Sequence, residues 1–486
     1  MKVCCCLTAL CALTLWGTTL AGEIFEHTDP STGSQVIVLK QGSMIARFAP
    51  SQGANVFSIE VAGIEYLRTP ANMYTFEGTE HGTPVLYPTP NRVRNAEFEF
   101  AGRQVAMEPN FGPHRIHGLV IGQPWRVVST GTTDTSAFVR SAIAFKPGES
   151  LYEQFPFAHE LLLEVTVTEG AVRWAYEVDN RSGKEAVPFG FGLHPYFLYQ
   201  GSRDNTLITL PATHQMEAQD VLPSGRLVPA SELDYPLGEP MSVRARSFDD
   251  VYWGLRAGEP SVIDFRDRGR QVKLTTSSEF THAVVWVENV PVLSVENQTS
   301  STDAHNLHAA GFEEEANLQV CGAGETCGGW IEYRFTASGE YGWIWDDPNF
   351  LLSQAHCASC HGIAFSGGRA PALLGGEWQH AHSEAEIVGV IQQGIPETEM
   401  PAFAGSFTAA QVEGLAGFME RVLKEMPGEE LQTALEVSKA GPRQSFLETF
   451  ALDTVVDGLD TPWSFAFLPD RRIILNEKPG RLRLFS

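Results

Sequence analysis

The sequence predicts a multidomain fold: a large all-β domain at residues 22–337, a small all-α domain at residues 347–426 and a short, incomplete β segment at residues 445–486. Three observations predict it. Short runs of alternating apolar and polar residues recur up to Ala337, an apolar stripe at helical spacing follows at residues 407–425, and alternation returns near the end. We expect residues 338–346 and 427–444 to be linkers, and an exposed helix is the alternative for the polar and charged stretch 427–444.

The chain is long and acidic. Its 486 residues are 43% hydrophobic and 19% charged, which is enough for two or three buried cores. The 34 Lys and Arg residues against 59 Asp and Glu residues give a net charge of −25. This charge argues against broad electrostatic attraction to nucleic acid or to an anionic membrane. We expect neutral or locally basic partners and no nucleic acid.

Residues 1–21 have the layout of a secretory signal peptide. A positive charge at Lys2 precedes an uncharged apolar stretch, and the small residue Ala21 stands at the expected cleavage point. We expect cleavage after Ala21, a periplasmic or secreted location and no membrane span in the mature protein. A retained anchor and a lipid on Cys11 are the alternatives. Cleavage would leave four of the eight cysteines: Cys321, Cys327, Cys357 and Cys360.

Residues 161–178 illustrate the pattern of the all-β domain. Leu163, Val165 and Val167 alternate with polar residues, Glu169 and Gly170 supply a turn, and alternation resumes at residues 172–178. This predicts a β-hairpin with one buried face and one wetter face.

Five short strings in the all-β domain contain candidate functional residues, namely Asn91-Arg92, His117-Gly118, His194, Asp249 and Glu296. The string VENQTSSTDAHN at residues 295–306 is the most specific. In order and separation, the five resemble the aldose 1-epimerase (galactose mutarotase) superfamily. The resemblance implies an all-β supersandwich of the galactose mutarotase type.

The resemblance also implies an acid and a base. The family's general base toward the anomeric hydroxyl corresponds to Glu296, and its general acid toward the ring oxygen corresponds to His194. Opening a hemiacetal ring requires a proton to leave one oxygen while another proton arrives at the second. A carboxylate and an imidazole suit this exchange.

Three further residues, Arg92, His117 and Asp249, are implied to hold sugar hydroxyls, with Asp250 as the alternative to Asp249. The string Leu-His-Pro-Tyr-Phe around His194 differs from the Asn-His-Ser-Tyr-Phe of many galactose-acting members. It resembles a divergent branch that also holds hexose-6-phosphate epimerases. Because an exported protein meets few sugar phosphates, we expect a free aldose as substrate, and its identity stays open.

Cys321 and Cys327 flank the string Gly-Ala-Gly-Glu-Thr between two strand-like runs. In an oxidising compartment, we expect a disulfide across a hairpin end. A zinc site is the alternative, although the sequence offers no second ligand pair nearby.

The apolar stripe at residues 407–425 predicts the main helix of the all-α domain. Thr408 stands three residues before Gln411, which is a capping-box pattern. The apolar residues that follow at helical spacing are Val412, Leu415, Phe418, Met419 and Val422.

The string Cys357-Ala-Ser-Cys360-His361 is a CxxCH motif, which predicts covalent attachment of one haem c. The two thiols join the haem vinyl groups, and His361 supplies one axial ligand to the iron. A redox-active CxxC motif is the alternative, but its usual βαβ context is missing here.

Met400 and Pro401 stand ahead of the predicted helix, as in the class I cytochrome c domains that this region resembles. The resemblance implies that the Met400 sulfur is the second axial ligand. Competing candidates are His380, His382 and Met419, of which Met419 is expected to be a core residue.

Strings at residues 459–470 and 476–482 resemble the opening of pyrroloquinoline-quinone (PQQ)-dependent aldose sugar dehydrogenases, which are six-bladed β-propellers. The resemblance is confined to residues 445–486. A propeller fragment of this length cannot close around a cofactor, so we expect no PQQ in this chain. An ordinary docking hairpin is the alternative.

Together, these features predict an exported aldose 1-epimerase that interconverts α and β anomers of a free aldose, fused to a haem domain that serves periplasmic sugar oxidation. A sugar dehydrogenase and a downstream redox protein are the expected electron partners. The alternative is a haem electron carrier whose β domain only binds carbohydrate, as a docking or sensing module.

Overall fold

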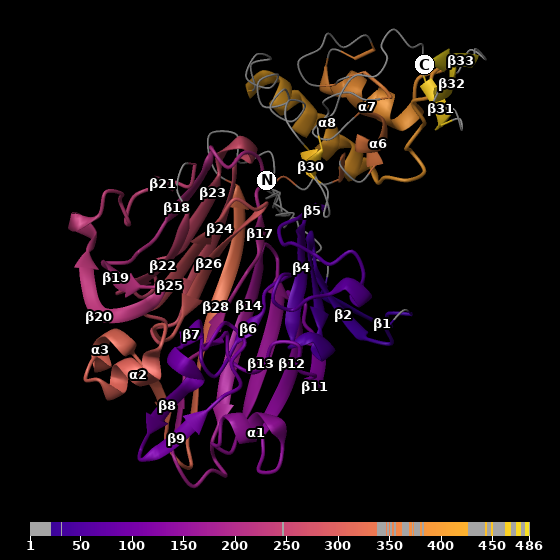
Figure 1. Ribbon diagram of the computed structural model, residues 1–486. Coiled ribbons are helices and arrows are strands. Elements are labelled where there is room, and N and C mark those ends of the chain that lie inside the picture. The colour runs from indigo at the N-terminus through magenta and orange to yellow at the C-terminus, as the bar shows by residue number, and fades with distance from the viewer. Residues whose placement is uncertain are drawn as a thin grey trace, which may run out of the picture. The chain divides into compact units, whose positions relative to one another are not determined.

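The computed structural model describes residues 21–30, 32–244 and 247–337, separate stretches between residues 347 and 425, and short strands between residues 443 and 485. The chain divides into two units, Met1–Val437 and Ser438–Ser486. Figure 1 shows their helices and strands. In the described part of the chain, no helix has the length and apolar character needed to cross a membrane.

A nine-stranded antiparallel sheet forms one layer of the β domain. Its spatial order is β11 (Arg126–Thr132), β12 (Ser136–Phe145), β13 (His159–Thr168), β14 (Ala171–Asp179), β28 (Thr326–Ala337), β24 (Arg270–Thr276), β23 (Ser261–Phe265), β18 (Thr206–Thr209) and β21 (Met241–Ser242). The hairpin predicted at residues 161–178 is confirmed as β13 and β14, with Thr168 paired to Ala171. Its alternate residues are buried, as the sequence pattern predicts.

A second antiparallel sheet contains the strands that carry most of the candidate site. Its main order is β20 (Leu222–Pro229), β19 (His214–Gln219), β22 (Phe248–Trp253), β25 (His282–Val287), β26 (Val292–Gln298), β16 (Gly192–Leu193) and β6 (Val85–Leu86), and β17 (Phe197–Leu198) also pairs with β26. Figure 1 labels β22, β25 and β26 of this sheet.

The two sheets share one hydrophobic core. Tyr333 of β28 contacts Trp174 of β14, with ring centroids 4.7 Å apart, and Phe197 of β17, at 5.6 Å. Leu293 and Val295 of β26 also point into this core and are fully buried. Each such side chain contributes about 1.5–3 kcal/mol when removed from water. The core therefore fixes which face of β26 remains for the site.

A five-stranded sheet formed by the first strands packs on the same core. Its order is β1 (Glu23–Thr28), β2 (Gln35–Gln41), β3 (Met44–Ala49), β4 (Asn55–Val61) and β5 (Ile64–Glu65). Ile37, Leu39 and Phe48 from these strands are fully buried in it.

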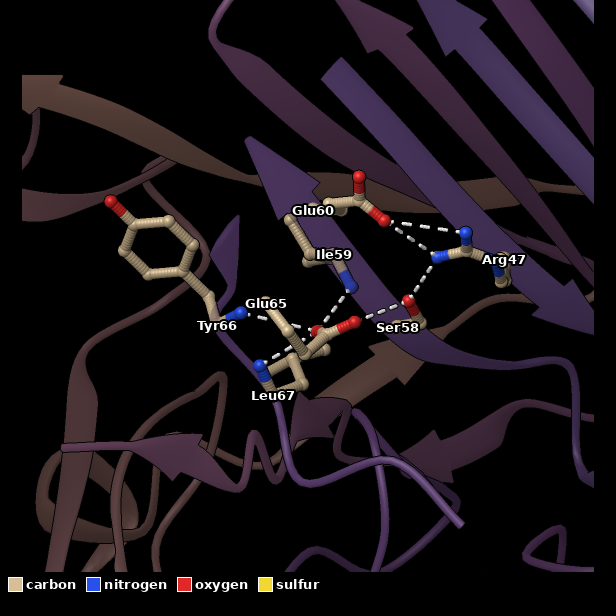
Figure 2. Close-up of polar contacts among 7 residues, drawn as sticks. All are labelled: Arg47, Ser58, Ile59, Glu60, Glu65, Tyr66 and Leu67. Carbon is tan, nitrogen blue, oxygen red and sulfur yellow. Dashed lines mark hydrogen bonds and ion pairs between the residues drawn. The ribbon is translucent and has the colours of Figure 1, made fainter. Parts of the chain in front are cut away.

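A carboxylate network at the β4–β5 turn is shown in Figure 2. Oε1 of Glu65 accepts hydrogen bonds from the backbone N–H groups of Ile59, Tyr66 and Leu67 at 2.9–3.1 Å, and the Ser58 hydroxyl donates to Oε2 at 2.5 Å. Burial raises the pKa of Glu65, and these hydrogen bonds oppose the shift. The network fixes the backbone of residues 65–67.

The segment after this turn supports the strand that leads away from His194. Arg68 N–H donates to the carbonyl of Tyr196 at 2.9 Å, and Leu198 N–H donates to the carbonyl of Tyr66 at 2.9 Å. The β4–β5 turn is therefore tied by backbone hydrogen bonds to a residue beside the candidate site.

Several short elements complete the β domain. They are β7 (Arg92–Val93), β8 (Glu97–Phe100), β9 (Arg103–Ala106), β10 (Arg115–Ile116), β15 (Val187–Phe189), β27 (Gln319–Cys321), α1 (Ser150–Gln154), α2 (Ala304–Ala309) and α3 (Glu313–Ala316). Leu307 of α2 and Ala316 of α3 pack against Val251 and Val284 in a small apolar cluster. The helices thus cover part of the face of the second sheet that does not belong to the main core.

The helical part of the first unit contains α6 (Ala358–His361), α7 (Glu384–Gln393) and α8 (Ala409–Glu425). The capping box is confirmed: Gln411 N–H donates to the Thr408 hydroxyl at 3.3 Å, and Thr408 N–H donates to Oε1 of Gln411 at 2.8 Å. Ile387 and Ile391 of α7 are buried with the apolar stripe of α8. Val422 has no described side chain, so that stripe is observed only through Met419.

In the second unit, β31 (Pro462–Phe467), β32 (Ile473–Glu477) and β33 (Leu482–Phe485) form an antiparallel sheet, and β29 (Arg443–Gln444) pairs with β30 (Thr449–Phe450). The strand-like alternation of this segment therefore corresponds to strands.

Candidate functional site

The candidate site lies on the face of the second sheet that points away from the main core. In the ladder, Ser294 of β26 pairs with Trp286 of β25, which pairs in turn with Asp249 of β22. Because alternate residues of a strand share a face, Ser294 and Glu296 point to the same side. Across the same ladder, Glu296 of β26 pairs with Val284 of β25, which pairs in turn with Val251 of β22.

His194 and Glu296 are in direct contact. His194 follows β16, and its backbone N–H donates to the carbonyl of Pro84 at 3.0 Å. Nε2 of His194 lies 3.2 Å from Oε1 of Glu296. The two residues are 7% and 2% exposed. The sequence-predicted acid and base therefore form one buried pair.

Burial moves the pKa values of this pair in opposite directions. It raises the pKa of Glu296 well above the ordinary value, and the Asp249 carboxylate raises it further. Burial lowers the pKa of His194 to about 4. These opposite shifts favour the protonated carboxyl group beside the neutral imidazole, and a proton can pass across the 3.2 Å contact to give a carboxylate beside an imidazolium.

Arg92 and Asp249 form a second charged pair beside the first. Nη2 of Arg92 lies 3.1 Å from Oδ2 of Asp249, and Nη1 donates to Oδ1 of Asn91 at 3.0 Å. Asn91 has a left-handed backbone (φ 55°), which asparagine tolerates, and it turns the chain into β7. The guanidinium carbon lies 5.1 Å from the ring centroid of Phe111, which is 49% exposed.

Asp249 and Asp250 point to opposite faces of β22. Asp249 pairs with Trp286 on the site face and contacts Arg92. Asp250 pairs with Val285, a core residue, and accepts a hydrogen bond from Nε2 of Gln215 at 2.8 Å. The structure thus brings Asp249, rather than Asp250, to the other candidate residues.

His117 lies against His194. The two rings are perpendicular, with centroids 5.1 Å apart. His117 has a left-handed backbone (φ 62°), and its N–H donates to the carbonyl of Asn91 at 2.8 Å. Gly118 follows because a Cβ there would lie within 2.2 Å of the Tyr87 carbonyl oxygen. Burial, His194 and Arg92 together lower the pKa of His117 well below its ordinary value, so the ring is neutral.

Several neighbours of the pair were not identified from the sequence. Gln298 donates from Nε2 to Oε2 of Glu296 at 3.0 Å, the Ser294 hydroxyl lies 3.4 Å from Nδ1 of His194, and Tyr196 stacks on His194 at 4.5 Å. Ser294 and Gln298 stand two residues before and after Glu296, so period-two spacing could have revealed them. Trp286 and Phe111 carry no such signal, because only the ladder and the loop bring them close.

The structure joins Cys321 and Cys327 in a disulfide, with Cα atoms 5.7 Å apart. The expected hairpin is wrong: β27 pairs with β15, whereas β28 pairs with β14 and β24. The side chain of Asn180 explains the turn, because its Nδ2 donates to the carbonyls of Cys321 and Gly322 at 3.0 and 2.9 Å. The disulfide therefore links two different sheets. The described residues contain no cluster that could hold a metal ion.

Cys357, Cys360 and His361 lie within one helical turn that ends with α6. His361 N–H donates to the carbonyl of Cys357 at 2.9 Å, so the three side chains occupy one face at helical spacing. Both cysteines are half-buried, and Sγ of Cys360 accepts a hydrogen bond from Nη2 of Arg369 at 3.1 Å. Nδ1 of His361 lies 2.8 Å from the carbonyl oxygen of Pro371. This contact fixes the ring and leaves Nε2 available to bind a metal ion. These residues fit covalent haem attachment.

The protonation of Cys357 argues against the redox-active alternative. Burial and, to a smaller extent, the neighbouring Cys360 raise the pKa of the Cys357 thiol to about 11. Redox-active CxxC motifs need the opposite shift, because the thiolate is the reactive form.

Met400 is half-buried in a tight segment after α7. Ile395 N–H donates to the Met400 carbonyl at 3.2 Å, and Gly394 (φ 69°) passes so close that a Cβ would lie 2.6 Å from that oxygen. Met419 is 5% exposed in the helical core, as expected, and His380 is exposed. His382 lies outside the described residues.

Comparison with protein families matches two parts of the chain. The family model for aldose 1-epimerase matches residues 35–334. The model for cytochrome c oxidase, cbb3-type, subunit III matches residues 351–419. A relative from Escherichia coli strain K12, the uncharacterized protein YihR, is 25% identical over 176 residues, with 35% of this chain and 54% of that protein covered. The chain spans about half the length of the curated relative it matches.

Solved structures show the same fold. A galactose mutarotase-like protein from Clostridium acetobutylicum has a TM-score of 0.60 at 19% identity, covering 66% of this chain and 99% of that one. The galactose 1-epimerase from Lactobacillus acidophilus NCFM has a TM-score of 0.54 at 12% identity, covering 66% and 100%. At such identities the likeness concerns the fold alone.

Proposed function

The chain belongs to the aldose 1-epimerase family, and from this premise we propose that it interconverts the α and β anomers of a free aldose, with Glu296 as general base and His194 as general acid. The observation that carries the proposal is the buried contact of 3.2 Å between these two side chains. The anomeric hydroxyl and the ring oxygen are bonded to the same carbon. Two side chains in contact with each other can therefore reach both oxygens.

The reaction uses the single proton that the pair holds. Glu296, as carboxylate, takes the proton of the anomeric hydroxyl while His194, as imidazolium, gives its proton to the ring oxygen. The bond between the anomeric carbon and the ring oxygen breaks, and an open-chain aldehyde forms. After rotation about the first carbon–carbon bond, the ring oxygen attacks the other face. His194 then regains its proton, and Glu296 returns its own.

The remaining candidate residues hold the sugar. Arg92 and Asp249 present a donor and an acceptor side by side, which suits adjacent hydroxyl groups. Because Asp249 neutralises Arg92 across 3.1 Å, this pair favours an uncharged sugar over a sugar phosphate. Phe111 offers an exposed ring beside Arg92 for the apolar face of the sugar.

The overall test is polarimetry on the full-length protein with several freshly dissolved aldoses. The expected result is a faster approach to equilibrium rotation in proportion to protein concentration. Saturable sugar binding without any acceleration would contradict the proposal. It would support instead a β domain that only binds carbohydrate.

Asp249→Asn is expected to raise KM for the aldose about tenfold, because the substitution removes a charged hydrogen-bond acceptor worth about 1.5–3 kcal/mol. The effect on kcat should be smaller. Initial rates from polarimetry over a range of sugar concentrations measure both constants. Asp250→Asn is the matched control: it is the adjacent residue on the opposite face and should leave KM unchanged. Equal effects of the two substitutions would contradict the role of Asp249.

For the helical domain, we propose that one haem c would be held covalently by Cys357 and Cys360, with His361 and Met400 as the side chains that would bind its iron. The match to a cbb3-type cytochrome model and the geometry of residues 357–361 support it. When bound, the haem supplies one-electron transfer. Pro371 orients His361 through its carbonyl, and residues packed on α7 and α8 shield the Cys357 side.

In its setting, the protein is proposed to be exported, with a cleaved leader at residues 1–21 and domain boundaries as expected from the sequence. A sugar dehydrogenase would consume one anomer, local mutarotation would replenish it, and the haem would pass the electrons to a downstream redox protein. Residues 445–486 are proposed to be a fragment of such a dehydrogenase, unable to hold PQQ by itself.

Met400→Ala is expected to change the haem spectrum and to lower the reduction potential by roughly 100 mV, within the range of about 0.8 V that axial ligands span. The reason is that the thioether sulfur favours ferrous iron. Spectroelectrochemical titration measures the shift. Met419→Leu is the control, since Met419 is buried in the helical core and should leave the potential unchanged. A shift in the control alone would assign the ligand to Met419.

A further inference from the structure

Gln298 is a polar neighbour of Glu296 on its own strand. It lies two residues further along β26, on the same face, and is fully buried. Its Nε2 donates to Oε2 of Glu296 at 3.0 Å, while Oε1 of Glu296 faces His194. The two carboxyl oxygens of Glu296 therefore differ in their partners: Oε2 is held by the Gln298 amide, and Oε1 faces His194.

The other end of the Gln298 amide has no partner. Its Oε1 is buried without a hydrogen bond among the described residues. A buried acceptor left in this state costs about 1–3 kcal/mol. The only side-chain hydrogen bond that the described residues show for Gln298 is the one to Glu296.

The neighbouring strand makes room for this side chain. Gly192 of β16 pairs with Gln298, and a Cβ at position 192 would lie 2.9 Å from Cγ of Gln298. His194 comes two residues after Gly192 on the same segment. The strand that supplies the acid therefore also leaves the space that lets Gln298 reach the base.

We propose that Gln298 is a positioning residue that holds the Glu296 carboxyl group with Oε1 toward the reacting oxygens and favours its ionised form through the amide N–H. The inference rests on the proposed mutarotase function. A donor to a carboxylate stabilises the charge, which counteracts the effect of burial on Glu296. The reactive arrangement, carboxylate beside imidazolium, is then more populated than burial alone would allow.

Gln298→Met leaves the titratable and charged groups near Glu296 chemically unchanged. They are His194, Asp249 and Arg92 at the site, His117 behind His194, and the hydroxyls of Tyr196 and Tyr333. A change in the pH profile on substitution of Gln298 can therefore be assigned to the lost hydrogen bond.

The test is Gln298→Met, which keeps length and bulk but removes the amide, with kcat/KM measured by polarimetry across pH. Without the donor, ionisation of Glu296 is less favourable. We expect the alkaline limb of the profile to move up by about one pH unit and the plateau to fall about tenfold. KM should change less than about twofold. Gly192→Ala, which pushes the same side chain away, should shift the limb in the same direction.

Ser261→Ala is the control, because the Ser261 hydroxyl is likewise buried without a partner in the described residues but lies in the other sheet. It should leave the limbs in place. A Gln298→Met enzyme with a lower plateau and unmoved limbs would overturn the proposal in favour of a structural role. So would an unchanged enzyme.

Infrared difference titration of the Glu296 carboxyl group separates this inference from the function it rests on. In the full-length protein, the carboxyl band of Glu296 is identified as the band that is missing in Glu296→Gln. Gln298→Met should raise the pH at which this band titrates. If the wild type does not accelerate mutarotation but this band still moves, the proposed function fails while the role of Gln298 stands. If the band does not move, the proposed role of Gln298 is wrong.

Discussion

Glu296→Gln is expected to abolish acceleration of mutarotation, with kcat falling about 10²–10⁴-fold toward the spontaneous rate. Glutamine has the same shape and can still meet Nε2 of His194, but it cannot accept the proton of the anomeric hydroxyl. The loss should therefore appear in kcat, with KM nearly unchanged. Polarimetry at saturating aldose measures it.

The fold should survive this substitution. In the folded protein the pKa of Glu296 is raised, so the folded state retains a proton that the unfolded chain releases as the pH rises above the ordinary value. Burying the ionisable group thus costs stability at neutral pH. We expect the free energy of unfolding of Glu296→Gln at pH 7 to equal or exceed that of the wild type. Glu313→Gln, on the exposed first turn of α3, is the control. An active Glu296→Gln enzyme would refute the assignment of the base.

Replacing both Cys357 and Cys360 with serine is expected to remove covalently bound haem completely. Thioether bonds to the two sulfurs are the only covalent link in the proposal, and serine cannot form them under the same conditions. The measurement is haem content after denaturing electrophoresis and acid extraction, on protein exported in cells with a haem-attachment system.

The control for this variant is Ser359→Ala, which changes the same segment and keeps both cysteines and His361. It should retain the full haem content. Haem that stays bound through denaturation in the double variant would show that attachment lies elsewhere. A wild type that carries no haem under these conditions would contradict the proposed cofactor.

Much of the fold could be predicted because its signals are local. The alternation around Leu163 and Val165 identifies strands, since a period of two marks a half-buried strand wherever the strand lies. The capping box at Thr408 and Gln411 involves residues three apart, and the structure has it. The CxxCH motif is equally local.

The site could be predicted only in part. Asp249 and Asp250 are adjacent and chemically identical, and only pairing with β25 decides which one faces Arg92. The disulfide pairing followed from spacing, but the strands around Cys321 and Cys327 belong to different sheets, and Asn180 from a distant part of the chain holds the intervening turn. Neither outcome has a signal in a short window of sequence.

The sequence by itself determined the residue types and the local periods: a glutamate and a histidine in strings that resemble the epimerase family, a CxxCH motif, and strands followed by helices. Tertiary structure alone decided that His194 and Glu296 touch, that Gln298 fits against Gly192, and that burial drives the pKa of Glu296 up and that of His194 down. The physical reason is that hydrogen bonding along a strand or helix depends on near neighbours. Burial and contact between charges depend on segments brought together by the two sheets.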